Sequence, residues 1–273
     1  MKKLSFLHKD IENKFLETYS NKQKEDVYRE KLVKKMIGYI DKIIEASPPK
    51  RIAVIGCGPV PTTIKVLAEL GYNPIGYEPV QKYVENANIY LSGNGEVYVG
   101  QCELVPAKNE SFDIIFCESV LEHVDSPERS LNEFYRILKP GGIVYIATEN
   151  KRKFSITGKN SEYNLPFYNW YPKSVKEGYI NMHLNYKPHL ANYTPLPAVH
   201  WYTYSSLCRI GRYAGFGKFY SIIDVMDEND SKLKKIFGGK LLLNWAKRNP
   251  WLKALLLRQY GSTIFMYKRE SFL

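Results

Sequence analysis

The strongest constraint on the fold is an alternation of short β-rich runs with helical stretches between Arg51 and Thr148. The β-rich runs read RIAVI, NPIGYE, EVYV, FDIIFC and GIVYIAT, and helical patterns over 61–70, 79–91 and 127–138 lie between them. Strands that alternate with helices form βαβ units, in which parallel strands are covered by helices on both faces. The pattern therefore predicts an α/β fold with a doubly wound, mostly parallel sheet.

A helical region precedes this alternation. Residues 24–46 place apolar side chains at the three-and-four spacing of an amphipathic helix, and Pro48 and Pro49 end it. A shorter helix is expected over 9–20. Residues 1–50 are therefore predicted to form an N-terminal helical cover, and residues 51–273 the α/β domain.

The alternation stops between residues 151 and 204, where 12 of 54 residues are aromatic and no regular period persists. Long segments of this kind inside compact domains are often functional, so 151–204 is predicted to be an aromatic lid insertion on the substrate side. A helix over 203–214, a strand over 218–224 and a final strand, STIFMYKR, are expected after it.

Basic side chains concentrate near the carboxyl terminus. The net charge is +11, and residues 231–270 alone hold ten basic side chains and one acidic side chain. Lysines and arginines alternate there with Trp and Leu, which is typical of a helix lying on an anionic bilayer. Residues 229–260 are predicted to be a basic helical insertion. Solvated lysines on an added hairpin are the simpler interpretation, and peripheral membrane contact through 232–258 is the alternative.

The cysteines and the amino-terminal residues bear on two questions: whether the protein holds disulfides or a metal, and in which compartment it is found. The four cysteines lie singly, without a CxxC pair or a histidine at ligand spacing, so neither a disulfide framework nor a bound metal is expected. Lys9 and Asp10 interrupt the first apolar run short of signal-peptide length, and no later run is long enough to span a membrane. A cytoplasmic protein is expected, with a membrane-peripheral one as the variant.

A glycine-rich turn, Gly56-Cys57-Gly58-Pro59, follows the first strand and opens directly into a helix. Glycines allow a sharp turn and the close approach of a ligand, and the N–H groups at the helix start favour an anionic group. Pro61 stands where a dinucleotide fingerprint has its third glycine, which argues against a nicotinamide or flavin cofactor. A tight turn without a ligand is the other interpretation.

The residues downstream carry a family pattern. Glu78 ends the second strand about twenty residues after the glycine turn, where a carboxylate can accept hydrogen bonds from ribose hydroxyls. GQCELVPAKNESFD, VLEHV and LKPGG follow within 100–150, and HWYT and AGF follow the predicted lid. Over roughly residues 50–150 the chain resembles the class I S-adenosylmethionine-dependent methyltransferases. The resemblance implies seven strands in that family's order and S-adenosylmethionine as the cofactor.

The resemblance also implies which residues touch the cofactor, all of them just after strand ends. They are Gly56, Cys57, Gly58 and Pro59 at the methionine end, Glu78 at the ribose, Gln101 and Cys102 at the adenine, and Glu118 and Ser119 on the sulfonium side.

Three positions depart from the family pattern. Val54 replaces the acidic residue before the loop, Val60 replaces the third glycine, and Gln101 replaces the aspartate that accepts from the adenine amino group. A glutamine can still accept through its amide oxygen. The loss of the acidic residue at Val54 requires another group to contact the cofactor's ammonium. The run 58–62 also resembles nicotianamine synthase, which uses the same cofactor for aminocarboxypropyl transfer.

A hydroxyl acceptor benefits from a base, and histidine suits neutral pH. His200 is the preferred catalytic candidate because it falls on a family position after the lid, and His123 of the LEHV turn is the second. A hydrogen-bonded anchor is an equally good explanation of His200, and a structural role is the more common one for His123. His183, Tyr168 and Tyr202 are expected to bind the substrate or to form the core of the lid.

These features predict S-adenosylmethionine-dependent O-methylation of a small hydroxyl-bearing acceptor. The aromatic lid and the basic segment favour a sugar or a lipid-linked glycan intermediate. The alternatives are RNA or protein methylation through the basic segment, aminocarboxypropyl transfer, and cofactor binding without turnover. No nucleic-acid-reading motif accompanies the charge, so a nucleic-acid partner is not expected.

Overall fold

A computed structural model describes residues 25–150, 170–172, 174–176, 178, 198–227, 230, 238–259 and 262–270. The strands are β1 (Arg51–Ile55), β2 (Asn73–Glu78), β3 (Glu96–Val99), β4 (Phe112–Glu118), β5 (Leu138–Thr148), β6 (Lys218–Ser221) and β7 (Ser262–Tyr267). The helices are α2 (Glu25–Asp41), α3 (Thr62–Glu69), α4 (Gln81–Leu91), α5 (Pro127–Ile137), α7 (Tyr204–Tyr213), α8 (Ile222–Val225), α9 (Gly239–Arg248), α10 (Pro250–Leu256) and the 3-10 turn η3 (Leu257–Gln259).

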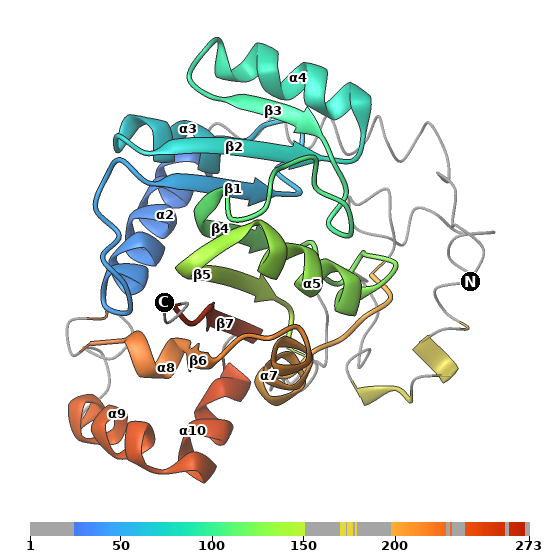
Figure 1. The fold of residues 1–273 in the computed structure, drawn as a ribbon. Coiled ribbons are helices and arrows are strands. Elements are labelled where there is room, and N and C mark those ends of the chain that lie inside the picture. Colours follow the sequence, from blue (N-terminus) through green and yellow to red (C-terminus); the bar gives the residue numbers. More distant parts are fainter. Residues whose placement is uncertain are drawn as a thin grey trace.

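The strands form one sheet in the order β3-β2-β1-β4-β5-β7-β6 (Figure 1). The first five strands in sequence run parallel, and β7 lies antiparallel between β5 and β6. The predicted seven-stranded, mostly parallel α/β fold is confirmed. The chain moves outward from β1 to β3 and then returns to β4, so β1 and β4 flank the switch point where such sheets form a ligand crevice at their carboxyl ends.

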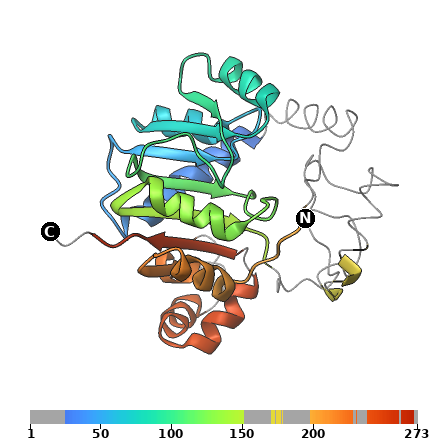
Figure 2. The same cartoon turned by 45° about the vertical axis from the view of Figure 1, so that its right-hand side comes forward.

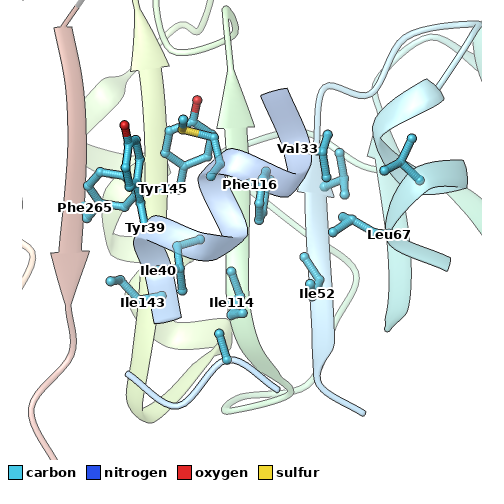
Figure 3. Packing of buried hydrophobic residues seen from close by; sticks show 14 of the residues in the cluster. Val33, Tyr39, Ile40, Ile52, Leu67, Ile114, Phe116, Ile143, Tyr145 and Phe265 are labelled. Atoms are coloured by element: carbon cyan, nitrogen blue, oxygen red, sulfur yellow. The ribbon is translucent and has the colours of Figure 1, made fainter. Parts of the chain in front are cut away.

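Helices cover both faces of the sheet, and each face has its own apolar core. One core packs α2, α3, α4 and α9 against the sheet, and the other packs α5 and α7 on the opposite face. Figure 3 shows α2 crossing the first face, with Val33 on the side of Ile52 and Ile40 near Ile114 of β4. Strands buried on both faces need continuous apolar runs, which explains the sequence FDIIFC in β4.

Local hydrogen bonds explain where the elements begin and end. Ser126 caps α5 by accepting from Arg129 N at 3.3 Å, and Pro127 occupies the first helical position, as predicted. The helix predicted over 24–46 ends earlier, at Asp41, whose carboxylate accepts from Ala46 N at 3.0 Å and fixes a turn.

One expectation for the C-terminal part also needs correction. The strand predicted over 218–224 ends at Ser221, because Ser221 N donates to Asp224 Oδ2 at 2.8 Å and starts α8. The basic helical segment is broken at Asn249, whose side chain accepts from the N–H groups of Trp251 and Leu252 and so caps α10. The helix predicted over 9–20 and most of the predicted lid lie outside the described residues.

Helices α9 and α10 form a pair beyond the β7–β6 side of the sheet, as Figures 1 and 2 show from two directions. Within the described part of the chain, no helix is long and apolar enough to cross a membrane. Helices α9 and α10 add a surface to the outer edge of the domain and do not extend its sheet.

Candidate active site

Four adjacent parallel strands end at one edge of the sheet and carry most of the candidate cofactor residues. The glycine turn follows β1, Glu78 ends β2, Gln101 comes shortly after β3, and Glu118 ends β4. Parallel strands present their carboxyl ends together, so residues far apart in the sequence meet here. The structure thus brings the predicted cofactor residues to one edge, called the cofactor edge below.

The two glycines of the turn meet different surroundings. Gly56 has φ +64° and Gly58 has φ +69°, a left-handed backbone region that glycine adopts without strain. A Cβ added to Gly56 would lie 2.4 Å from Val120 Cγ2, whereas nothing lies within 4 Å of a Cβ added to Gly58. Gly56 therefore serves the packing of the turn against the loop after β4, and Gly58 faces open space that a ligand could use.

Glu78 connects the ends of β1 and β2. Its carboxylate accepts from Gly58 N at 3.1 Å and from Val80 N at 3.3 Å, and the residue is only 6 % exposed. Burial raises the pKa of the Glu78 carboxyl to about 7, although the two backbone hydrogen bonds pull in the opposite direction. The group therefore changes charge near neutral pH.

Glu118 lies at the end of β4 in a small polar cluster. Arg29 of α2 forms an ion pair with Glu118 Oε2 at 3.0 Å, and Tyr145 of β5 donates to Oε1 at 2.9 Å. Sequence reasoning did not find Arg29 or Tyr145. The amphipathic pattern predicted that a helix covers the sheet, but no local signal shows that one of its arginines reaches the end of β4. Ser119, with φ +53°, turns the chain away and donates its N–H to Ala147 O at 2.7 Å.

The residues after β3 form a tight turn. Gln101 and Leu104 exchange backbone hydrogen bonds of 3.3 and 3.0 Å, which leaves the Gln101 side chain exposed, while Cys102 is buried. Burial raises the pKa of the Cys57 and Cys102 thiols far above the ordinary value. Both thiols therefore stay protonated at neutral pH, so neither suits a nucleophilic role.

The segment 198–203 is fastened to the loop after β4. His200 Nε2 lies 2.9 Å from Val124 O, Tyr202 donates its hydroxyl to Leu121 O at 3.0 Å, and the N–H groups of Val199 and His200 donate to Glu122 O. Tyr202 is buried, and burial raises the pKa of its phenol. These contacts give His200 and Tyr202 anchoring roles, and their parts in catalysis and substrate binding stay predictions.

The other predicted residues of the acceptor side are placed less fully. His123 lies in the turn after β4, where its N–H donates to Val120 O at 2.9 Å, so it sits beside the residue that packs on Gly56. His183 and Tyr168 lie outside the described residues. Among the described residues no group of three or more His, Cys, Asp or Glu side chains is arranged to hold a metal ion.

The cofactor edge fits S-adenosylmethionine. Each oxygen of the Glu78 carboxylate accepts one backbone hydrogen bond and keeps acceptor capacity, as the two hydroxyls of a ribose require. The open side of Gly58 leaves room for the ligand to pass close to the backbone. Glu118 and Arg29, which pair with each other at 3.0 Å, place a carboxylate and a cation at the end of β4, and these are the two charges that an amino-acid group could use.

A family model described as "Methyltransferase domain" matches residues 53–146, the region that holds β1 to β5 and the cofactor edge. Curated relatives match over a similar region. A ubiquinone biosynthesis O-methyltransferase of Parvibaculum lavamentivorans is 29% identical over 134 residues, which cover 46% of this chain and 51% of the relative. The mitochondrial enzyme of the same name from Rattus norvegicus is 31% identical over 112 residues, covering 38% and 32%. The chain thus spans about half the length of the first relative and about a third of the second.

Solved structures share the fold over most of the chain. A methyltransferase from Haloferax volcanii, described as putative and seen in complex with the activator Trm112, aligns with a TM-score of 0.54 at 16% identity and covers 94% of this chain and 97% of that one. A phosphoethanolamine N-methyltransferase of Haemonchus contortus, in complex with S-adenosyl-L-methionine, aligns with a TM-score of 0.51 at 13% identity and covers 87% and 53%. At these identities the likeness concerns the fold.

Proposed function

We propose, from the premise that residues 53–146 match the methyltransferase-domain family, that the protein is a class I S-adenosylmethionine-dependent enzyme that transfers the cofactor's methyl group to a hydroxyl oxygen. The observation that carries the proposal is the contact between Gly58 N and Glu78 across the ends of β1 and β2. It sets an acceptor for ribose hydroxyls beside a turn that is open to a ligand. Relatives named as O-methyltransferases support oxygen as the acceptor atom.

The chain's own residues would act chiefly by positioning. S-adenosylmethionine, when bound, supplies a methyl group on a sulfonium that an oxygen can attack in line with the breaking bond. Glu78 would hold the ribose, and Arg29 with Glu118 would hold the amino-acid end, so that the reactive carbon is fixed relative to the loop after β4. Such positioning accounts for much of the acceleration of a displacement between two bound reactants.

His200 would take the proton of the acceptor hydroxyl. With its hydrogen on Nε2 and directed to Val124 O, the basic nitrogen of the ring is Nδ1. The backbone contact would fix the ring orientation, as a positioned base requires. His123 is the second candidate for this role because it lies on the loop after β4, to which the His200 segment is hydrogen-bonded.

The acceptor would be a small molecule that carries a hydroxyl group. Aromatic residues are frequent in the predicted lid, which suits the burial of a ring or of a polyol face. A sugar or a lipid-linked glycan intermediate remains the proposed class, and acceptors of ubiquinone biosynthesis are added by the relatives' names, with phenols as their assay probe. A cytoplasmic location is part of the proposal.

The test is a transfer assay with methyl-labelled S-adenosylmethionine and three acceptor sets: phenols, free sugars and polyprenyl-linked glycans. We expect label on oxygen of one set, with S-adenosylhomocysteine as the coproduct. Methylthioadenosine as the coproduct would indicate aminocarboxypropyl transfer instead. Cofactor binding without product from any acceptor set, RNA or protein would contradict turnover.

A variant in the same assay examines the base. His200→Asn should lower transfer by at least about a hundredfold while S-adenosylhomocysteine binding is kept. Loss of thermal stability with unchanged turnover per folded molecule would show that His200 only anchors its segment.

A further inference from the structure

Helices α9 and α10 expose a set of large apolar side chains. Leu241 is 76 % exposed and Trp245 61 % on α9, and Trp251 is 87 % exposed and Leu255 57 % on α10. In each helix the two residues are four positions apart and so share one face. Single exposed apolar residues are common on proteins, whereas two tryptophans and two leucines exposed on adjacent helices are typical of an interaction surface.

The opposite sides of both helices are attached to the domain. Leu243 and Ala246 of α9 are buried in the core. Lys247 donates to Met226 O at 2.7 Å, and Lys253 of α10 forms an ion pair with Asp224 at 2.5 Å. The exposed faces are therefore directed away from the domain, and these two lysines are used for attachment.

Positive charge lies next to the exposed apolar faces. Arg248 is three positions after Trp245 and so continues the exposed stripe of α9, and Arg258 lies in the turn η3 that directly follows α10. Both arginines are exposed, and the sequence holds no Asp or Glu between residues 231 and 269. The partner of this surface should thus combine negative charge with an apolar layer.

An anionic lipid bilayer has that combination. Tryptophan rings and leucines enter the boundary between headgroups and acyl chains, and arginines extend to the phosphates. Helices of 10 and 7 residues are too short to span the hydrocarbon layer and would lie in its plane. Nucleic acid fits less well, because exposed leucines gain nothing from a phosphate backbone.

The patch is connected to the cofactor edge. Asn150 follows the carboxyl end of β5, and its side-chain amide donates to Leu257 O at 2.9 Å, directly after α10. The same end of β5 pairs with Glu118 of β4. A bilayer held by α9 and α10 would therefore lie near the edge where the proposed reaction takes place.

We propose that α9 and α10 form a docking surface for anionic bilayers, through Leu241, Trp245, Trp251 and Leu255 with Arg248 and Arg258. Resting on the proposed function, the surface also identifies the acceptor class: a hydroxyl-bearing molecule carried by a lipid at the membrane surface.

Flotation of the full chain with vesicles tests the surface. We expect binding to phosphatidylcholine vesicles that contain phosphatidylglycerol, weakened by salt, and little binding to phosphatidylcholine alone. Trp245→Ser with Trp251→Ser should lower binding at least about tenfold, because the rings no longer enter the bilayer. Ile89→Ser, at a 74 % exposed apolar side chain of α4 near the opposite end of the sheet, is the matched control and should bind as the wild type does.

A second pair of variants examines the charge. Arg248→Gln with Arg258→Gln should lower binding to the anionic vesicles about tenfold or more. Arg209→Gln with Lys108→Gln removes two exposed cations elsewhere and should change it much less. Three results would overturn the docking surface: equal binding to both vesicle types, no binding to either, or binding that the Trp245→Ser, Trp251→Ser double variant leaves unchanged.

Methyl transfer measured on the same samples separates this inference from the proposed function. Vesicle binding without any transfer would leave the docking surface standing and remove the proposed function. Transfer to a soluble acceptor without vesicle binding would do the reverse. If vesicles are not bound, but dimers or RNA complexes form and the Trp245→Ser, Trp251→Ser double variant abolishes them, the surface would belong to a second copy or to RNA. That result would overturn the proposal.

Discussion

The cofactor edge and the C-terminal helix pair are held in place by different kinds of contact. At the cofactor edge the decisive groups are backbone N–H groups and a missing side chain, as Gly58 N, Val80 N and the tight packing of Gly56 show. At α9 and α10, side chains make the attachment, through the buried Leu243 and Ala246 and through the lysines Lys247 and Lys253. Backbone geometry requires particular residues at fixed spacing and leaves a pattern that other proteins share, whereas side-chain attachments can be made in many ways.

The family match follows this division. It covers residues 53–146, which include the cofactor edge, and ends before the helix pair. On the proposed function, the region that the family model matches would bind the cofactor, and the acceptor and its delivery would depend on the rest of the chain.

The two glycines of the turn give the largest expected effects. Gly56→Ala should lower the free energy of unfolding by about 4 kcal/mol, because the new Cβ clashes with Val120 and the residue keeps φ +64°. Gly58→Ala should cost about 1 kcal/mol, since its Cβ meets open space. Only the second variant should fold well and still fail to bind S-adenosylhomocysteine. Thermal unfolding and calorimetry measure both, and normal binding by Gly58→Ala would show that the open space is not the cofactor site.

A core substitution in α9 examines the independence of the two regions. Leu243→Ala should destabilise the protein by about 3 kcal/mol, because Leu243 is buried against the first-face core. The affinity for S-adenosylhomocysteine at low temperature should stay within about twofold of the wild type, since distant sites are close to additive. Urea unfolding and calorimetry check this, and a parallel loss of affinity would mean that the helix pair shapes the cofactor edge.

Arg29 examines how far the cofactor edge extends beyond the matched region. Arg29→Met should weaken S-adenosylhomocysteine binding about tenfold, because a charge-assisted hydrogen bond contributes about 1.5 kcal/mol or more. Lys34→Met on the same helix removes a surface ion pair with Glu30 and should leave the affinity unchanged. If the wild type, Arg29→Met and Lys34→Met bind with equal affinity, then Arg29 does not contact the ligand, and the amino-acid end is held by the loops alone.

The pKa of Glu78 predicts the smallest effect on ligand affinity. With a value of about 7, the ionised fraction rises about fourfold between pH 6.5 and pH 8, so S-adenosylhomocysteine affinity should rise about fourfold. Glu78→Gln should abolish that dependence in calorimetry across this range, and a pH dependence retained in the variant would assign the titration to another group.

The same group affects stability in the opposite sense. Because the folded pKa lies above the usual value of 4.5, the folded state holds the proton longer, and stability falls as pH rises from 4.5 to about 7. The total contribution is on the order of 3 kcal/mol. Urea unfolding of the wild type and of Glu78→Gln should diverge over this range, and parallel curves would contradict the raised pKa.

The sequence predicted the sheet, the glycine turn and Glu78 because each depends on local spacing. The alternation of strands and helices gave the parallel sheet, and the resemblance gave the strand order and the place of the cofactor residues. The sequence did not predict that Arg29 and Tyr145 meet Glu118, because the packing angle of α2 on the sheet decides that contact. It also did not show that α9 and α10 turn their tryptophans outward, since burial depends on which face meets the core.

The most direct test of the central claim is calorimetry of S-adenosylhomocysteine with the wild type and with Glu78→Ala. Glu85→Ala, an exposed glutamate on α4, is the matched control. The account predicts one site per chain with micromolar affinity, a loss of about a hundredfold in Glu78→Ala, and no change in Glu85→Ala. No binding by the folded wild type, or equal binding by Glu78→Ala, would contradict the claim that the contact between Gly58 and Glu78 marks the cofactor site.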